Sequence, residues 1–176
     1  LLLHPLTIPL WAGILMLFGN TLMATMPLSI KWFFLAVLAL NTLVAPALCI
    51  GLLRAFRLIP DLRLSEPRQR LIPILIVLLS YVSCLMMLSD VMMAFLIRRF
   101  LFAAMGCVVL TLIVTPFWKI SLHMTSIGGL LALLTALNAS GLGLGQFPYT
   151  LVLFILLAGL LGSARLWLGS HNLAQI

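Results

Sequence analysis

The sequence predicts an all-α membrane protein, a polytopic bundle of about six transmembrane helices. Hydrophobic residues make up 64% of the 176 residues and charged residues only 7%. No soluble domain can bury that much apolar surface, so we expect the chain to lie in a lipid bilayer. Its apolar runs are long and do not alternate every second residue as barrel strands do, and this pattern favours helices.

The expected spans follow from the requirement that a helix has about 20 apolar residues to cross a bilayer. Five stretches separate the expected spans: MPLSIK, a long polar segment at 54–70, the pair Arg98 and Arg99, WKISLH, and the glycine-rich NASGLGLGQFP. The arginine pair is expected to form a tight turn. Pro46 is expected to kink the second span, and SARLWLGSH is expected to begin a further helix after the sixth. The six expected spans cover about 7–24, 31–53, 71–96, 100–117, 122–137 and 149–161.

Charged residues are few and mostly basic. Asp61, Glu66 and Asp90 are the only acids beside ten Lys and Arg, and the net charge is +7. So few acids argue against a paired-carboxylate hydrolase, a two-metal site and an ion-coupled transporter, and the three cysteines lack metal-ligand spacing. The basic excess indicates anionic partners, either lipid phosphates or a phosphorylated substrate. We expect no metal, no cofactor and no nucleic-acid partner.

Three polar clusters, at 54–70, 119–123 and 165–175, are expected to share one membrane face. Two predicted spans separate the first cluster from the second, and two more separate the second from the third. An even number of crossings returns the chain to the same side each time. The positive-inside rule does not decide which side this is, because the arginines of a substrate site are not topology signals.

The second cluster, WKISLHM, has the pattern of a helix that begins beside a phosphate. Ser121 stands where a polar loop enters an apolar run, which is a usual N-cap position. A helix N-terminus presents free N–H groups and a partial positive charge, both of which suit a phosphate. Lys119 lies just before Ser121, and His123 falls in the first turn. A capped helix with an interfacial lysine and histidine would explain the same residues without a ligand.

The third cluster, SARLWLGSHNLAQ, separates Arg165 from His171 by five residues. Gln175 follows His171 by four residues, one helical turn, so its amide is expected to reach the imidazole. A snorkelling arginine and an interfacial histidine would be the structural alternative. Taken together with the second cluster, however, the pattern fits metal-free phosphoryl transfer. One histidine would attack phosphorus, another would protonate the leaving oxygen, and cations would hold the equatorial oxygens.

These residues resemble the type 2 phosphatidic acid phosphatase superfamily, whose motifs read K-x6-R-P, P-S-G-H and S-R-x5-H-x3-D. ISLH keeps the serine and the histidine of the second motif, Ser121 and His123. ARLWLGSHNLAQ keeps the arginine and the histidine of the third, Arg165 and His171. The resemblance implies that His171 is the nucleophile, that His123 is the general acid, and that Ser121 and Arg165 bind phosphate. It covers mainly residues 63–175 of a single membrane domain, 1–176.

The chain departs from the family pattern at several positions. Gln175 replaces the aspartate that orients the nucleophile and stabilises its cation. In the first motif, Arg63 and Arg70 keep the spacing of six residues, although the following proline is missing. A solvated basic loop is the alternative reading there, and Lys119 is a competing source of the missing lysine. His4 is expected to be an interfacial bystander.

The sequence therefore predicts a lipid phosphate or diphosphate hydrolase of the bacterial inner membrane, acting through a phosphohistidine. The alternative is a relative of such enzymes that binds phospholipid without turnover, which Gln175 favours. A small transporter is less favoured, because few polar residues fall within the spans. Since the chain begins at a leucine and stops directly after the third cluster, we expect it to be part of a longer protein.

Overall fold

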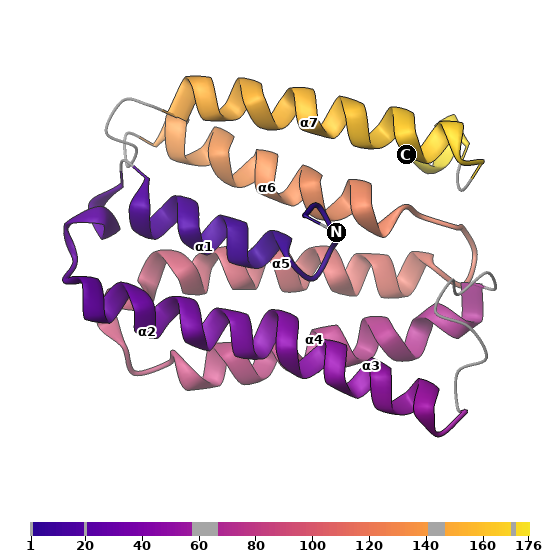
Figure 1. Ribbon diagram of the computed structural model, residues 1–176, viewed down its shortest axis with the longest axis horizontal. Coiled ribbons are helices and arrows are strands. Elements are labelled where there is room, and N and C mark those ends of the chain that lie inside the picture. The colour runs from indigo at the N-terminus through magenta and orange to yellow at the C-terminus, as the bar shows by residue number, and fades with distance from the viewer. Residues whose placement is uncertain (1, 20, 58–66, 141–146, 170–171) are drawn as a thin grey trace.

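The computed structural model describes residues 2–19, 21–57, 67–140, 147–169 and 172–176. These residues are predominantly helical, and no strand occurs among them, so the expected all-α class is confirmed. The helices lie side by side along the long axis of the molecule (Figure 1). Their bounds are α1 Ile8–Phe18, α2 Leu28–Leu38, α3 Ala45–Ala55, α4 Leu71–Met87, α5 Phe95–Val114, α6 Leu122–Ala139 and α7 Phe147–Trp167.

Among the described residues, four helical stretches are long and apolar enough to cross a membrane: Leu28–Ala55, Met92–Val114, Leu122–Ala139 and Tyr149–Trp167. Many large hydrophobic side chains on the helices stay exposed, as lipid-facing residues do. The chain is therefore an integral membrane protein. The helix α4 has 17 residues and α1 only 11, which at about 1.5 Å per residue leaves α1 well short of a hydrocarbon core of about 30 Å.

The first expected span, 7–24, ends earlier than predicted. The helix α1 stops at Phe18, and Thr21 then caps a 3-10 helix, η1 Leu22–Thr25, by accepting a hydrogen bond from the Met23 N–H. The Thr21 hydroxyl also donates to the Met16 carbonyl, inside the bundle. A buried threonine with backbone partners on both sides breaks the helix where apolar composition alone predicted its continuation.

The second expected span is one helical stretch that contains a π-helical segment, η2 Ala39–Val44, between α2 and α3. Pro46 follows this segment directly. Proline has no N–H to donate and its ring crowds the carbonyl of the preceding turn, and the Ala45 N–H bonds to the Leu40 carbonyl, five residues back. A local irregularity was thus expected at the right place, and a π-helical segment is the form it takes.

The prediction of a tight turn at Arg98 and Arg99 is wrong. Both residues lie in the first turns of α5, and the chain reverses earlier, after α4 ends at Met87. The Arg98 guanidinium donates to the Ser89 carbonyl, and that of Arg99 lies 6.0 Å from the centre of the Phe95 ring. A long basic side chain can belong to the first turns of a helix and still extend to the aqueous boundary of the membrane. For this reason the arginine pair does not mark a loop.

The sixth expected span, 149–161, and the separate helix expected after it are one helix, α7. Small residues such as Gly162 and Ser163 do not interrupt it. The helix ends at Trp167, and Gly169 has a φ of +59°, a left-handed conformation typical of the residue after a helix. Arg165 therefore lies in the last turn of a long apolar helix.

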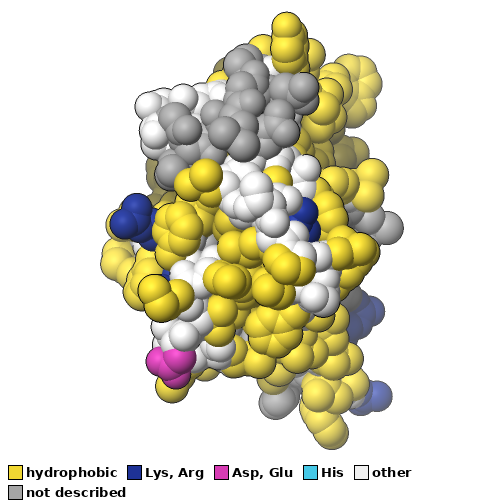
Figure 2. All heavy atoms as spheres, turned by 90° about the vertical axis from the view of Figure 1, so that its left-hand side faces the viewer, with side chains coloured by type: hydrophobic (Ala, Val, Ile, Leu, Met, Phe, Trp, Pro, Cys, Tyr) yellow, Lys and Arg dark blue, Asp and Glu magenta, His cyan; other side chains and the backbone are white. Residues whose placement is uncertain are grey.

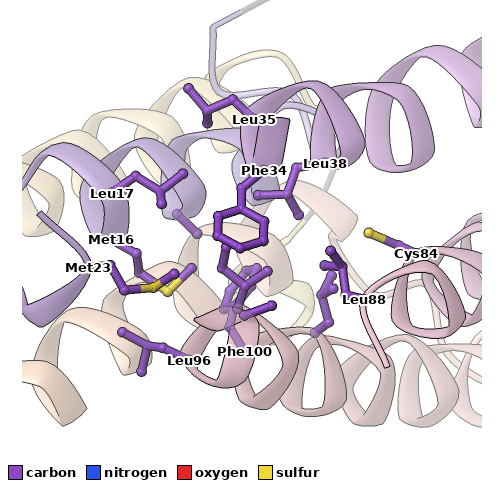
Figure 3. Close-up of a cluster of buried hydrophobic side chains, with 14 of the residues drawn as sticks. Met16, Leu17, Met23, Phe34, Leu35, Leu38, Cys84, Leu88, Leu96 and Phe100 are labelled. Atoms are coloured by element: carbon purple, nitrogen blue, oxygen red, sulfur yellow. The ribbon is translucent and has the colours of Figure 1, made fainter. Parts of the chain in front are cut away.

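The hydrophobic core lies among α1, α2, α4 and α5, and reaches α6 and Phe154 of α7. Phe34 and Leu38 of α2 are fully buried against α1 and α5 residues such as Met16 and Phe100 (Figure 3). The helix α1 packs on α2, α5 and α6, whereas α7 packs mainly on α6. This packing brings the N-terminal end of α1 next to α6, which becomes important for the site.

Candidate functional site

The helices α3, α5 and α7 end, and α4 and α6 begin, at one end of the bundle, which we call the polar end (right-hand side of Figure 1). The segments before α4, before α6 and after α7 are in contact there. Arg70 Nη1 donates a long hydrogen bond of 3.5 Å to the Ile120 carbonyl, and the Ser121 N–H donates to the Gln175 carbonyl across 3.1 Å. The convergence predicted by counting spans is confirmed for these residues.

The opposite end of the bundle, which faces the viewer in Figure 2, shows mainly hydrophobic side chains, with few charged groups among the residues described there. Asp90 lies in the turn between α4 and α5. The length of α4, about 25 Å by its helical rise, separates it from Arg70. Within the described ranges, then, Asp90 is the only acid, and it is remote from the polar end.

Ser121 is the N-cap of α6, as predicted, with φ −82° and ψ 102°. However, its hydroxyl caps no N–H group. The side chain is fully buried, and Oγ has no hydrogen-bond partner among the described residues. A serine at this position ordinarily accepts a hydrogen bond from the second or third helical N–H. The structural alternative, a simple helix cap, therefore does not explain this hydroxyl.

Arg165 projects from the last turn of α7 and is half-buried. Its Nε atom is buried and has no hydrogen-bond partner in the part of the chain that the structure describes. Unpaired buried polar atoms are costly and rare, and each one calls for an explanation. Ser121 and Arg165 are the residues that carry such atoms here, and both were predicted from the sequence to bind phosphate.

Arg70 is the second cation of the cluster and is only 9% exposed. Its burial, and then the positive charge of Arg165, lower the pKa of its guanidinium from the usual value. Two neighbouring arginines repel each other, and this repulsion is relieved when an anion binds between them. The partial positive charge of the α6 N-terminus at Ser121 acts in the same direction.

The C-terminal segment folds back along α7 and closes one side of the cluster. A methyl group built on Gly162 would lie 3.5 Å from Met124 Cε and 3.7 Å from Ile176 Cγ2, so the three residues are neighbours. The short 3-10 helix η5, Leu173–Gln175, precedes Ile176. This packing is what brings the Gln175 carbonyl to the Ser121 N–H.

The expectation that Gln175 follows His171 on one helical turn is wrong. Asn172 has an extended backbone and caps η5, and the Gln175 Oε1 atom accepts a hydrogen bond from the Asn172 N–H at 3.2 Å. This reciprocal capping arrangement uses the amide oxygen that was expected to orient the imidazole. The helix breaks because Gly169 adopts a left-handed conformation after α7.

His123 lies in the first turn of α6, half-buried, two residues from Ser121. Its ring is in edge-to-face contact with that of His4, with the centroids 5.5 Å apart. His4 is expected from the sequence to be an interfacial bystander, and no local pattern predicts this contact, because it depends on the packing of α1 against α6. The one signal for His4 in the sequence is that the chain has only three histidines.

Three other predicted site residues are less closely defined. Lys119 is half-buried in the connection before α6, beside Ile120. The predicted nucleophile His171 and the predicted phosphate ligand Arg63 lie outside the described residues. The described part of the site thus contains Arg70, Ser121, His123, Arg165 and Gln175, from all three predicted motifs.

No protein-family model, no curated protein and no solved structure matches the chain.

Proposed function

We propose that the protein is a lipid phosphatase of the type 2 phosphatidic acid phosphatase kind, which hydrolyses a lipid phosphate or diphosphate without a metal ion. The observation that carries this proposal is a pair of buried polar atoms, Ser121 Oγ and Arg165 Nε, that find no hydrogen-bond partner in the described part of the chain, together with the buried cation Arg70. A tetrahedral oxyanion would supply acceptors for both guanidinium groups, and one of its oxygens would accept a hydrogen bond from the Ser121 hydroxyl.

In the proposed reaction, a nitrogen of His171 attacks phosphorus, and the bond from phosphorus to the leaving oxygen breaks. His123 donates its proton to that oxygen, so that the dephosphorylated lipid leaves neutral or as a lipid monophosphate. Neutral His123 then takes a proton from water, and the resulting hydroxide attacks the phosphohistidine. This second step releases inorganic phosphate and restores both histidines. Arg165, Arg70 and the Ser121 hydroxyl hold the equatorial oxygens, with Lys119 and Arg63 as additional phosphate ligands.

A lipid is the proposed substrate because the polar cluster stands at the end of a bundle whose helices expose many large apolar side chains along their length. Exposed side chains such as Leu156 and Leu160 on α7 are 62% and 68% accessible, so acyl or prenyl chains would contact the same helices that position the headgroup. We place the enzyme in the bacterial inner membrane. We further propose that α1 and α4, although shorter than the four long helical stretches, lie in the membrane beside them and complete a domain of six membrane helices, in which α1 crosses only part of the hydrocarbon core.

One observation favours a second candidate function, a protein that binds phospholipid without turnover. The Gln175 amide oxygen already accepts the Asn172 N–H, and an amide carries no negative charge to stabilise a histidine cation. Gln175→Asp discriminates between the two functions, with Gln175→Glu as the matched variant that keeps the side-chain length. If the protein is an enzyme weakened at this position, an acid raises its turnover. If it only binds lipid, neither variant releases phosphate.

The proposed function is tested by phosphate release from the purified protein in detergent containing EDTA. The substrates are phosphatidic acid, phosphatidylglycerol phosphate and a polyprenyl diphosphate. We expect release from at least one of them that is insensitive to EDTA and lost in His123→Ala and His171→Ala, with both variants still folded. If both variants hydrolyse lipid phosphates as well as the parent, the assignment fails.

A further inference from the structure

His4 has no role in the reaction described above, yet its ring lies against that of the proposed general acid. The ring centroids of His4 and His123 are 5.5 Å apart, and the ring planes are at 85° to each other. Edge-to-face pairs at this separation attract one another, because the positive edge of one ring meets the negative face of the other. The contact joins the N-terminal segment to the first turn of α6.

The turn that carries His4 is fixed by hydrogen bonds at both of its ends. The Leu2 carbonyl accepts from Thr7 Oγ1 at 2.9 Å and from Trp11 Nε1 at 3.0 Å. The His4 carbonyl accepts from the same Thr7 hydroxyl at 2.8 Å and from the Thr7 N–H at 2.9 Å. Since α1 packs on α6, this turn holds the His4 ring at a defined place beside His123.

The hydrogen bonding of the His4 ring indicates its protonation state. Its Nδ1 atom accepts a hydrogen bond from the Leu6 N–H at 3.3 Å, so this nitrogen carries no proton and the neutral ring has its proton on Nε2. Partial burial lowers the pKa of His4 as well, which favours the same neutral form. A neutral His4 does not repel the protonated form of His123, whereas a second imidazolium would.

We propose that His4 is a positioning residue for His123: its neutral ring packs against the His123 ring and holds it in the orientation from which it protonates the leaving oxygen. This inference rests on the proposed phosphatase reaction. Cations described at this end of the bundle include Lys119 in the connection before α6, Arg70 directly before α4, and Arg165 on α7. Unlike them, His4 offers an uncharged ring surface, and its ring contacts that of His123.

The kinetic test compares His4→Ala with His4→Phe in the full chain. Removing the ring is expected to lower kcat about two- to tenfold, the effect of losing one aromatic pair. KM for the lipid phosphate should change less than twofold, because Arg70, Ser121 and Arg165 are untouched. Phe restores an aromatic ring without a titrating group, so His4→Phe should recover most of kcat. Leu2→Ala, an exposed position in the same turn, is the matched control and should behave as the parent.

A spectroscopic test does not require turnover. In protein labelled with ¹³C at the histidine rings, His4→Ala should shift the ring signals of His123, assigned with His123→Gln and His171→Gln, while Leu2→Ala should leave them in place. If the His123 signals do not shift in His4→Ala, the inference is overturned. It is also overturned if they shift while the kcat of His4→Ala equals that of an active parent. If the parent releases no phosphate, the proposed function fails, and the signals still decide whether His4 orients His123.

Discussion

The backbone N–H of Ser121 donates a hydrogen bond to the carbonyl oxygen of Gln175 across 3.1 Å. This bond ties the N-terminus of α6 to the segment that follows α7. Each of the two residues belongs to one of the predicted motifs, so the bond is a direct link between them. The Ser121 hydroxyl itself is buried and has no hydrogen-bond partner among the described residues.

Ser121→Ala separates a ligand-binding hydroxyl from a helix cap. If the hydroxyl capped α6, its removal would lower the free energy of unfolding by about 0.5–2 kcal/mol. Because this hydroxyl is buried without a partner, we expect the thermal stability in detergent to stay the same or rise. Hydrolysis of lipid phosphate, measured as kcat/KM, should fall about tenfold or more, since a hydrogen bond to a charged oxygen contributes about 1.5–3 kcal/mol.

The control for this comparison is Thr135→Ala. Its hydroxyl is on an exposed position of α6 and donates back to the Leu131 carbonyl at 2.8 Å. Activity should not change in that variant. A Ser121→Ala protein that loses stability and keeps its activity would identify Ser121 as a structural residue.

Arg165→Met should remove the ability of an anion to stabilise the protein. Inorganic phosphate or vanadate is expected to raise the Tm of the parent, because the anion relieves the repulsion between Arg165 and Arg70. Without anion, the variant should be no less stable than the parent, since a like charge has been removed. The matched control, Arg54→Met, changes an exposed arginine in the last turn of α3 and should keep the full anion response. An equal response in both variants would place the anion elsewhere.

His4 should make the stability of the protein depend on pH. Its pKa lies below 6.5 in the folded protein, because burial disfavours the charged ring, whereas the unfolded chain titrates near 6.5. The unfolded state therefore binds more protons between the two values. Stability is retained above about pH 6.5 and lost as the pH falls through the folded pKa.

The measurement is thermal unfolding of the parent and of His4→Phe from pH 8 to pH 5. The difference between the two curves isolates His4 from the other histidines, and it should be flat above about pH 7. The parent should lose more stability than the variant on acidification. Parallel curves over the whole range would show that His4 titrates alike in both states.

Gly162 should tolerate alanine and reject a large side chain. An alanine Cβ would meet Met124 and Ile176 at ordinary contact distances of 3.5 and 3.7 Å. Leucine would extend into the space that Ile176 occupies and displace the C-terminal segment, and with it the bond from Ser121 to Gln175. We expect Gly162→Ala to keep its activity and Gly162→Leu to lose at least tenfold in kcat/KM while still inserting into membranes. Equal activity of the two variants would show that the site does not depend on this packing.

The meeting of three polar segments could be predicted because it needs only the parity of membrane crossings between them. The points where helices begin and end could not be predicted in the same way, because they depend on the hydrogen-bond partners of single side chains. Because arginine is rare inside membrane spans, the Arg98–Arg99 pair predicts a turn, yet Arg98 reaches the Ser89 carbonyl from within α5. Likewise, Thr21 ends α1 early through hydrogen bonds to backbone groups.

Within the site, the residues of each motif could be identified from local spacing, but not their geometry. The spacing of Gln175 predicted a helical turn, and the left-handed Gly169 breaks that helix. His4 has no motif around it, and only the packing of α1 on α6 brings it to His123. A contact between such distant segments leaves no local pattern to read.

In the proposed reaction, the cluster of Arg70, Ser121 and Arg165 holds a phosphate for transfer to a histidine. The most direct measurement is the amount of ³²P bound covalently to the protein. The purified protein is mixed briefly with ³²P-labelled lipid phosphate in EDTA, the reaction is stopped without acid, and the protein is separated from the lipid. We expect label that survives alkali, is released by acid, and is absent from His171→Ala and strongly reduced in Arg165→Met. Two results together would contradict this mechanism. The first is release of labelled phosphate by His171→Ala at the rate of the parent, and the second is the absence of labelled protein at every time point.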